Sequence, residues 1–489
     1  MGQFNVTNAG LAPSQDQSIL STNYLQWNDP TQAATFVDFA QQYLPELYEQ
    51  EVERFGNRTL SGFLRMVGAE MPMTSDQVIW SEQNRLHVGY DDVDKADAAG
   101  GTVFTVQTPL GAAPNEVVVR INQSIVVFDP VSGLTLKGLV TAAANDATPA
   151  PGTFTFTAVC YTAATFAALG NAGLKIFVYG SDFAKGTEGM IGSVTPQVTQ
   201  FSNRPIIIKD KYFVNGSDTA QIGWIEVATE DGTSGYLWYM KAESETRLRY
   251  EDYLEMAMVE GELATATSGV TVNTAANNYG TGTEGLFASL NARGNVYSGF
   301  AGAAAPGAGA LGDFDAILQQ LDLQGAIEEN MLFLDRATAL DFDDMIAAQA
   351  GGGFSSTAAA SYGLFDNESE MALNFGFSGF RRGSYDFYKT DWKYLNDAST
   401  RGMVTNIKGV LVPAGTSTVY DQMLGSNIRR PFLHVRYRAS ETDDRRMKSW
   451  ITGSVGGAYT SSLDAMEVHF LSERCLVTQA ANNFVLFTS

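Results

Sequence analysis

Residues 236–262 read YLWYMKAESETRLRYEDYLEMAMVEGE. A seven-residue spacing places apolar and charged side chains along one stripe of this stretch, and a glycine ends it. The stripe contains Tyr236, Met240, Glu243, Arg247, Tyr250, Leu254, Ala257 and Gly261. About 26 residues rising ~1.5 Å each form a helix of about 40 Å, which is long for a globular protein. The stretch therefore predicts one long helix, which we expect to pack along an extended part of the protein and support it.

The residues before this helix predict a long β-hairpin over Thr195–Ala228. Its β-branched runs flank Asn215-Gly216, a strong turn signal. A long exposed hairpin is marginally stable by itself, so we expect it to reach onto a neighbouring subunit.

A segment of different composition, 98–189, precedes the hairpin. It holds short alternating runs such as Glu116–Ile121, Thr153–Ala158 and Leu174–Tyr179, separated by turn-forming residues. This spacing predicts a small inserted β-barrel or sandwich that is removable from the rest of the chain. The acidic run Asp91–Asp97 just before it is expected to be a solvated loop.

The ends of the chain have other patterns. The first thirty residues are polar and predict an extended arm, and residues 31–55 predict an amphipathic helix. Further on, the helical patterns of Phe314–Ile327 and Arg336–Ala350 flank the strand Met331–Leu334. This alternation predicts a mixed α/β region.

Composition limits the class of protein. The chain has 489 residues, 45% of them hydrophobic, and a net charge of −23, which predicts a folded protein that repels nucleic acid and anionic membranes. Cys160 and Cys475 lie far apart, so a disulfide framework is not expected. The longest apolar stretch, Tyr161–Gly180, contains a lysine and three glycines, which is unsuitable for a bilayer span. We also see no secretion signal at the start, and expect a soluble protein in a reducing compartment.

Catalytic patterns are lacking in the sequence. The three histidines are isolated, and neither a Walker loop nor a Gly-x-Ser-x-Gly elbow occurs. Asp341, Asp343 and Asp344 have ligand chemistry for a divalent cation, but on a helix they are more typical of a hydrated face. We therefore expect no enzyme, no cofactor and no metal site.

Two segments of opposite charge stand out. Residues 313–345 hold nine acids and one base, and residues 429–448 hold seven bases and three acids. Either the segments face each other within one subunit, or the acidic face of one copy meets the basic face of the next. The candidate contact residues between subunits are Lys209, Lys211, Arg429, Arg430, Arg436, Arg438, Asp341, Asp343 and Asp344.

The order of arm, hairpin, long helix and α/β region resembles the Hong Kong 97-type major capsid protein of tailed bacteriophages. The resemblance implies an α+β fold in which the hairpin is the extended loop, the long helix is the spine of a peripheral domain, and the α/β region is the axial domain. The implied divisions are an arm and helix (1–60), the start of the peripheral and extended-loop region (61–97), an inserted β domain (98–189), the extended-loop hairpin (190–230), the peripheral domain with the spine helix (231–310), the first part of the axial domain (311–370), peripheral return strands (371–406), and axial and C-terminal strands (407–489).

The resemblance also implies a function. Such a protein assembles into hexamers and pentamers of an icosahedral capsid, which encloses double-stranded DNA without sequence-specific binding. Portal, scaffolding and decoration proteins are the implied partners, and the virion, assembled in the host cytoplasm, is the implied location. Two other classes stay open from the residues: a surface-layer or adhesive carbohydrate-binding protein, and a hydrolase with paired carboxylates.

Overall fold

The protein is described by a computed structural model, in which the chain forms two compact units, one of residues up to Trp80 and from Ser202 onward, the other of Ser81–Phe201. The described residues are 60, 62–67, 69–83, 87, 89–98, 100–107, 118–143, 153–163, 165–190, 198–220, 227–228, 234–235, 238–265, 267–270, 280–298, 308–325, 327–342, 378–421, 426–455 and 460–489. The predicted arm and the helix over 31–55 lie outside them.

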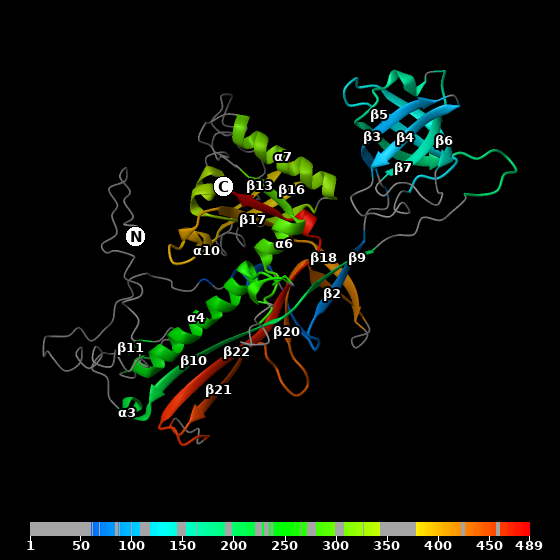
Figure 1. Ribbon diagram of the computed structural model, residues 1–489. Coiled ribbons are helices and arrows are strands. Elements are labelled where there is room, and N and C mark those ends of the chain that lie inside the picture. The colour runs from blue at the N-terminus through cyan, green and yellow to red at the C-terminus, as the bar shows by residue number, and fades with distance from the viewer. Residues whose placement is uncertain are drawn as a thin grey trace. The chain divides into compact units, whose positions relative to one another are not determined.

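A five-stranded sheet forms one half of the first unit, and its central strand is β22 (Figure 1). Its strands are β1 (Ala69–Met73), β20 (Leu433–Arg438), β22 (Ala465–Thr478), β10 (Ile206–Asn215) and β21 (Lys448–Gly453). On one side β22 pairs antiparallel with the whole of β10, from Ile206 opposite Arg474 to Asn215 opposite Ala465. On its other side it pairs with β20 and β21 in turn.

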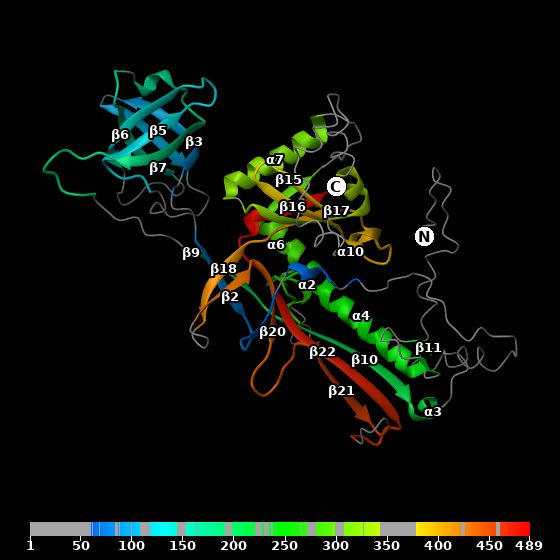
Figure 2. The same cartoon turned by 180° about the vertical axis from the view of Figure 1, so that it is seen from behind.

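Helix α4 (Trp238–Glu260) runs along β10 and β22, as Figures 1 and 2 show from opposite sides. Tyr250 is fully buried, stacks on Phe470 with ring centroids 5.7 Å apart, and donates a hydrogen bond to the Ile208 carbonyl at 3.2 Å. Leu254 is buried in the same cluster. The predicted long helix is therefore confirmed, with ends within two residues of those expected.

A six-stranded sheet forms the other half of this unit. In order, its strands are β13 (Asn295–Ser298), β23 (Val485–Thr488), β17 (Ile407–Pro413), β14 (Glu329–Leu334), β16 (Tyr385–Asp391) and β15 (Ser378–Arg382). Helix α7 (Ala308–Gln324) buries Phe314 and Leu321 against this sheet. The predicted strand and the helix before it are confirmed, and the predicted helix after it is described only for residues 336–342, which are helical.

A shared core joins the two sheets. Phe63 of α2 (Phe63–Val67) lies 4.5 Å from Phe333 of the six-stranded sheet and 4.3 Å from Trp392, measured between ring centroids. Val435 and Leu476 of the five-stranded sheet belong to the same buried cluster. Because apolar side chains from both sheets are removed from water together, the two sheets share one core.

Two predicted divisions of this unit do not follow the boundaries of its sheets. The strands expected to return to the peripheral domain, β15 and β16, lie in the six-stranded sheet, where β16 pairs parallel with β14. The segment 407–489 does not stay in one sheet, since β17 and β23 enter the six-stranded sheet while β20, β21 and β22 enter the five-stranded one. Long-range strand pairing decides both placements, and local patterns do not reveal it.

The predicted hairpin over Thr195–Ala228 is wrong. β9 (Val198–Asn203) pairs with β2 (Val78–Gln83), and β10 pairs with β22. Asn215 has φ −71°, whereas an Asn-Gly hairpin turn needs positive φ at both central residues, and Gly216 starts the short helix α3 (Gly216–Thr219). Pairing with the central strand β22 buries the inward-facing side chains of β10, and this burial stabilises the chain more than a local Asn-Gly turn would. The expected second arm falls mostly outside the described residues.

The second unit contains a closed six-stranded barrel in the order β3-β4-β7-β6-β5-β8 (Figure 1). Its strands are β3 (Gly89–Ala98), β4 (Gly101–Gln107), β5 (Gln123–Phe128), β6 (Thr135–Ala143), β7 (Thr153–Cys160) and β8 (Leu174–Ser181). Phe104 lies at its centre, 5.3 Å from the Phe156 ring and 5.1 Å from the Phe166 ring. Closure leaves the barrel without a free sheet edge.

The predicted start of this module, at residue 98, is wrong because β3 begins at Gly89. The acidic run Asp91–Asp97 is a strand and not a loop: Val93 and Lys95 are buried, whereas Asp91 and Asp97 are exposed. Asp92 adopts the left-handed φ of 56° where the β3–β8 register shifts, a conformation that aspartate tolerates better than most residues. Charges on the outward positions conceal a strand whose inward positions are buried.

The barrel closes its own core, so its removal should leave the first unit folded. We expect that replacing residues 87–190 with a short Gly/Ser linker gives a protein that still unfolds in one cooperative thermal transition. Circular dichroism melting tests this. Loss of the transition would show that the first unit depends on the barrel for its stability.

Candidate functional site

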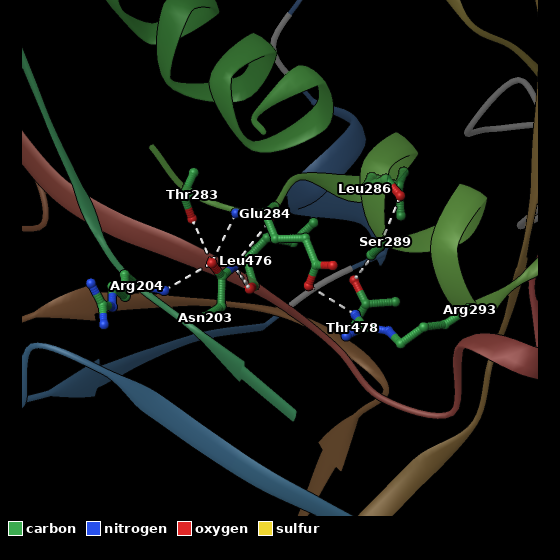
Figure 3. Close-up of polar contacts among 9 residues, drawn as sticks. All are labelled: Asn203, Arg204, Thr283, Glu284, Leu286, Ser289, Arg293, Leu476 and Thr478. Carbon is green, nitrogen blue, oxygen red and sulfur yellow. Dashed lines mark hydrogen bonds and ion pairs between the residues drawn. The ribbon is translucent and has the colours of Figure 1, made fainter. Parts of the chain in front are cut away.

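A buried amide, Asn203, organises the root of the β2–β9 ribbon (Figure 3). Its Oδ1 accepts hydrogen bonds from the Thr283 hydroxyl at 3.1 Å, the Glu284 N–H at 2.8 Å and the Arg204 N–H at 2.8 Å. Its Nδ2 donates to the carbonyls of Glu284 at 2.9 Å and Leu476 at 2.7 Å. Asn203 is 1% exposed, so one amide satisfies backbone groups of its own segment and of two distant segments.

Glu284 and Arg293 extend this network to the other ribbon strand. The Glu284 carboxylate accepts a hydrogen bond from Arg293 of α6 (Leu286–Arg293) at 2.9 Å, and the Arg293 guanidinium lies 5.6 Å from the centre of the Trp80 ring of β2. Ser289 of α6 also bonds the Thr478 hydroxyl at 3.3 Å (Figure 3). We call Asn203, Glu284, Arg293 and Trp80 the ribbon clamp, since they anchor both β2 and β9. Sequence reasoning missed it, because a single asparagine carries no pattern.

The candidate contact lysines lie on the outer face of the five-stranded sheet, the face opposite α4. Successive side chains of β10 point to opposite faces, so Lys209 and Lys211 face away from Ile208 and Tyr212. Lys211 pairs with Glu467 of the same chain at 3.3 Å. These lysines therefore belong to a paired strand and not to a free hairpin.

The basic segment is largely neutralised by acids close to it in the fold. Arg438 pairs with Asp76 and with Glu473, the latter at 3.1 Å. Arg445 also pairs with Glu473 at 3.1 Å, and Arg446 pairs with Glu70. Glu473 is buried, and these cations replace the water that its carboxylate loses on burial.

The acidic segment has different partners. Asp315 accepts two hydrogen bonds from Arg382, at 2.8 and 2.7 Å, and Asp322 accepts one from the Tyr385 hydroxyl. The ion pairs found among the described residues do not join the acidic segment to the basic one, and the interpretation that the two segments face each other within a subunit stays a prediction. Asp341 lies in the helical residues 336–342. Asp343, Asp344 and the side chain of Arg429 lie outside the described part.

Three residues at the junction of β19 (Ser426–Pro431) and β20 form a cationic cluster: Arg430, His434 and Arg436. His434 is 1% exposed, and its Nδ1 lies 3.0 Å from the Pro431 carbonyl, which it bonds as a donor. Burial, reinforced by Arg436 and Arg430, lowers the pKa of His434 to about 4. Burial and then Arg430 lower the pKa of Arg436. The neighbouring thiol of Cys475 is neutral, since burial raises its pKa to about 12.

In the described ranges, no group of three or more His, Cys, Asp or Glu side chains is arranged to hold a metal ion. No helix within those ranges has the length and apolarity required to cross a bilayer.

Comparison with known proteins gives structural likenesses only. No family model and no curated protein matches the chain. The mature capsid of bacteriophage PhiM1 matches with a TM-score of 0.40 and 7% identity, over 91% of each chain. The chain is similar to phage capsid proteins. A chain of Microbacterium phage Oxtober96 matches with a TM-score of 0.39 and 10% identity, over 94% of this chain and 99% of that one. The capsid of an empty GTA particle matches with a TM-score of 0.34 and 8% identity, over 95% and 99%.

The hydrogen bonds that Asn203 makes in the ribbon clamp should stabilise the folded protein. We expect Asn203→Ala to lower the free energy of unfolding by about 2–4 kcal/mol, because it leaves the buried Glu284 and Leu476 backbone groups without a partner. Urea denaturation measures this. The matched control is Asn215→Ala, which removes an exposed side chain bonded only to Asp218 at 3.2 Å and is expected to cost less than about 0.5 kcal/mol. Equal effects of the two substitutions would contradict the assignment.

His434 gives the stability a defined pH dependence. The folded protein keeps this imidazole neutral down to about pH 4, whereas the unfolded chain protonates it near its ordinary pKa of 6.5. The free energy of unfolding should therefore fall as the pH drops from about 6.5 toward 4, by about 3 kcal/mol from this group. His434→Gln should lose that part of the slope while keeping the part due to carboxylates. Parallel pH profiles for the two proteins would show that His434 is not buried as a neutral group.

Proposed function

We propose that the protein is a shell subunit that assembles into hexamers and pentamers of an icosahedral capsid around double-stranded DNA. The observation that carries the proposal is the five-stranded sheet with α4 on one face only. At ~1.5 Å per residue the 23 residues of α4 form a helix about 35 Å long. Such a braced sheet is stiff and presents its other face to a neighbour.

The outer face of this sheet has the character of a contact surface. Trp450 stacks on His469 with ring centroids 5.1 Å apart and is 37% exposed, and Ile207 is 51% exposed. Lys209 and Lys211 lie beside them on β10. Exposed aromatic and aliphatic side chains among charged ones are typical of surfaces that bind protein.

The charge distribution supports protein contacts over DNA contacts for the basic segment. Arg438, Arg445 and Arg446 already pair with carboxylates of their own chain, which leaves little net positive charge for phosphate. A chain with a net charge of −23 repels DNA overall. The genome would therefore be enclosed without sequence-specific binding. Portal, scaffolding and decoration proteins, assembly in the host cytoplasm and the virion location are parts of the same proposal.

One observation favours a second candidate, an adhesive carbohydrate-binding protein. Phe177 and Tyr179 on β8 are each 50% exposed on the barrel, and Lys137 lies 5.8 Å from the centre of the Tyr179 ring. Exposed rings of this kind can stack on sugar faces, and the adjacent lysine can donate hydrogen bonds.

Electron microscopy of the purified protein separates the candidates. We expect closed shells or rings of six and five subunits, because the braced sheet and its outer face would join copies in closed symmetry. Sheets or fibres would instead favour a surface layer. Dispersed monomers at concentrations of about 100 μM would overturn the capsid proposal, since standard protein interfaces associate well below that level.

A further inference from the structure

The cationic cluster contains buried polar atoms that lack partners. The Nε atoms of Arg430 and Arg436 and the Nε2 atom of His434 are each buried and make no hydrogen bond in the described part of the chain. Nearly all buried polar groups in folded proteins are hydrogen-bonded, and each exception has a cost. The two arginine Nε atoms are donors whose lack of a partner at this strand junction requires a cause, whereas Nε2 of the neutral His434 is an acceptor.

No carboxylate of the described chain is available to compensate these charges. Glu473, the closest acid on β22, is already bonded by Arg438 and Arg445. Arg436 lies opposite Cys475 in the β20–β22 register, and in the described part of the chain its guanidinium donates a single long hydrogen bond, 3.4 Å from Nη1 to the Pro72 carbonyl. Both guanidinium groups are half-buried, Arg430 is near enough to lower the pKa of Arg436, and neither has an anionic partner in the described part of the chain.

We propose that Arg430 and Arg436 form an oxyanion site that is filled by a side-chain carboxylate of a second copy of the chain. The inference rests on the proposed function and names one contact through which subunits join. Arginine suits this role because its planar guanidinium binds carboxylates by parallel hydrogen bonds. Within the described part of one subunit, no carboxylate fills the site.

Charge complementarity favours a second copy as the source. The chain has 54 acids against 31 bases, so every copy carries carboxylates in excess. Glu328 and Glu329 of the acidic segment are exposed and make no ion pair among the described residues, and they are the first candidates. DNA phosphate is the less favoured source, since the net charge of the chain opposes its approach.

The test uses the full chain and three glutamine variants. Arg430→Gln and Arg436→Gln keep a polar side chain and remove one of the two neighbouring charges. In free subunits, we expect each variant to leave the melting temperature unchanged or raised, because repulsion between the guanidinium groups is relieved. In the assembly reaction, followed by sedimentation, we expect at least a tenfold loss of associated protein. The matched control, Arg445→Gln, removes an arginine that is paired with Glu473 and should lower the melting temperature of the free subunit.

Small anions identify the occupant. Glutarate, which carries carboxylates like that of glutamate, should raise the melting temperature of free wild-type subunits above a chloride control of equal ionic strength, and should not do so for either variant. A rise with phosphate and not with glutarate would overturn the carboxylate assignment. No rise with either anion, or a lowered melting temperature in both variants, would overturn the site.

The assembly outcomes separate this inference from the proposed function. Shells formed equally well by the wild type and both variants would overturn the inference alone. Self-association without shells, lost in both variants, would overturn the capsid proposal and support the inference. A wild type that never self-associates would overturn both.

Discussion

The antiparallel pairing of β10 with β22 is the interaction on which the first unit depends. It joins residues 250 to 268 positions apart along ten consecutive pairs, and it creates the surface that α4 covers with Tyr250 and Leu254. β22 then continues into the segment that leads to β23, a strand of the six-stranded sheet. Its Leu476 carbonyl also accepts the hydrogen bond from Asn203. One strand therefore connects the braced sheet, the second sheet and the ribbon clamp.

Two glutamates control the charge of the region around β20. Glu473 bonds Arg438 and Arg445, and Glu70 bonds Arg446 and Arg474. A buried carboxylate is tolerated only when cations and hydrogen bonds replace its water, so these arginines are structural before they are anything else. Arg430 and Arg436 have no such acid among the described residues. The proposed contact role of the basic segment therefore rests on Arg430 and Arg436, and not on the arginines that pair with Glu473 and Glu70.

Unpaired edge strands can pair with other chains, and the barrel and the first unit differ in how they limit this. The barrel closes on itself, and its aromatic interior around Phe104 is independent of the rest of the chain. The first unit keeps open sheets, with β10 and β15 at edges of its two sheets in the described residues. Lys209 and Lys211 on β10 are the kind of charged side chain that protects an exposed edge from uncontrolled pairing. In the proposed assembly, this protection would keep copies from joining through unintended strand pairing.

Local periodicity in the sequence determined the long helix, the strand around Leu332 and the presence of short strands in the module that precedes β9. Each of these depends on residues within one turn or one strand, so the pattern is readable without the fold. Tertiary structure alone decided the rest. The Asn215-Gly216 turn gave way to pairing with β22, because burying Tyr212 and Val214 against a distant strand outweighs a local turn preference. Charge counts located the acidic and basic segments, but their partners, Arg382 for Asp315 and Glu473 for Arg438, come from elsewhere in the chain. Asn203 had no signal in the sequence, since its role arises only where three distant backbone segments meet.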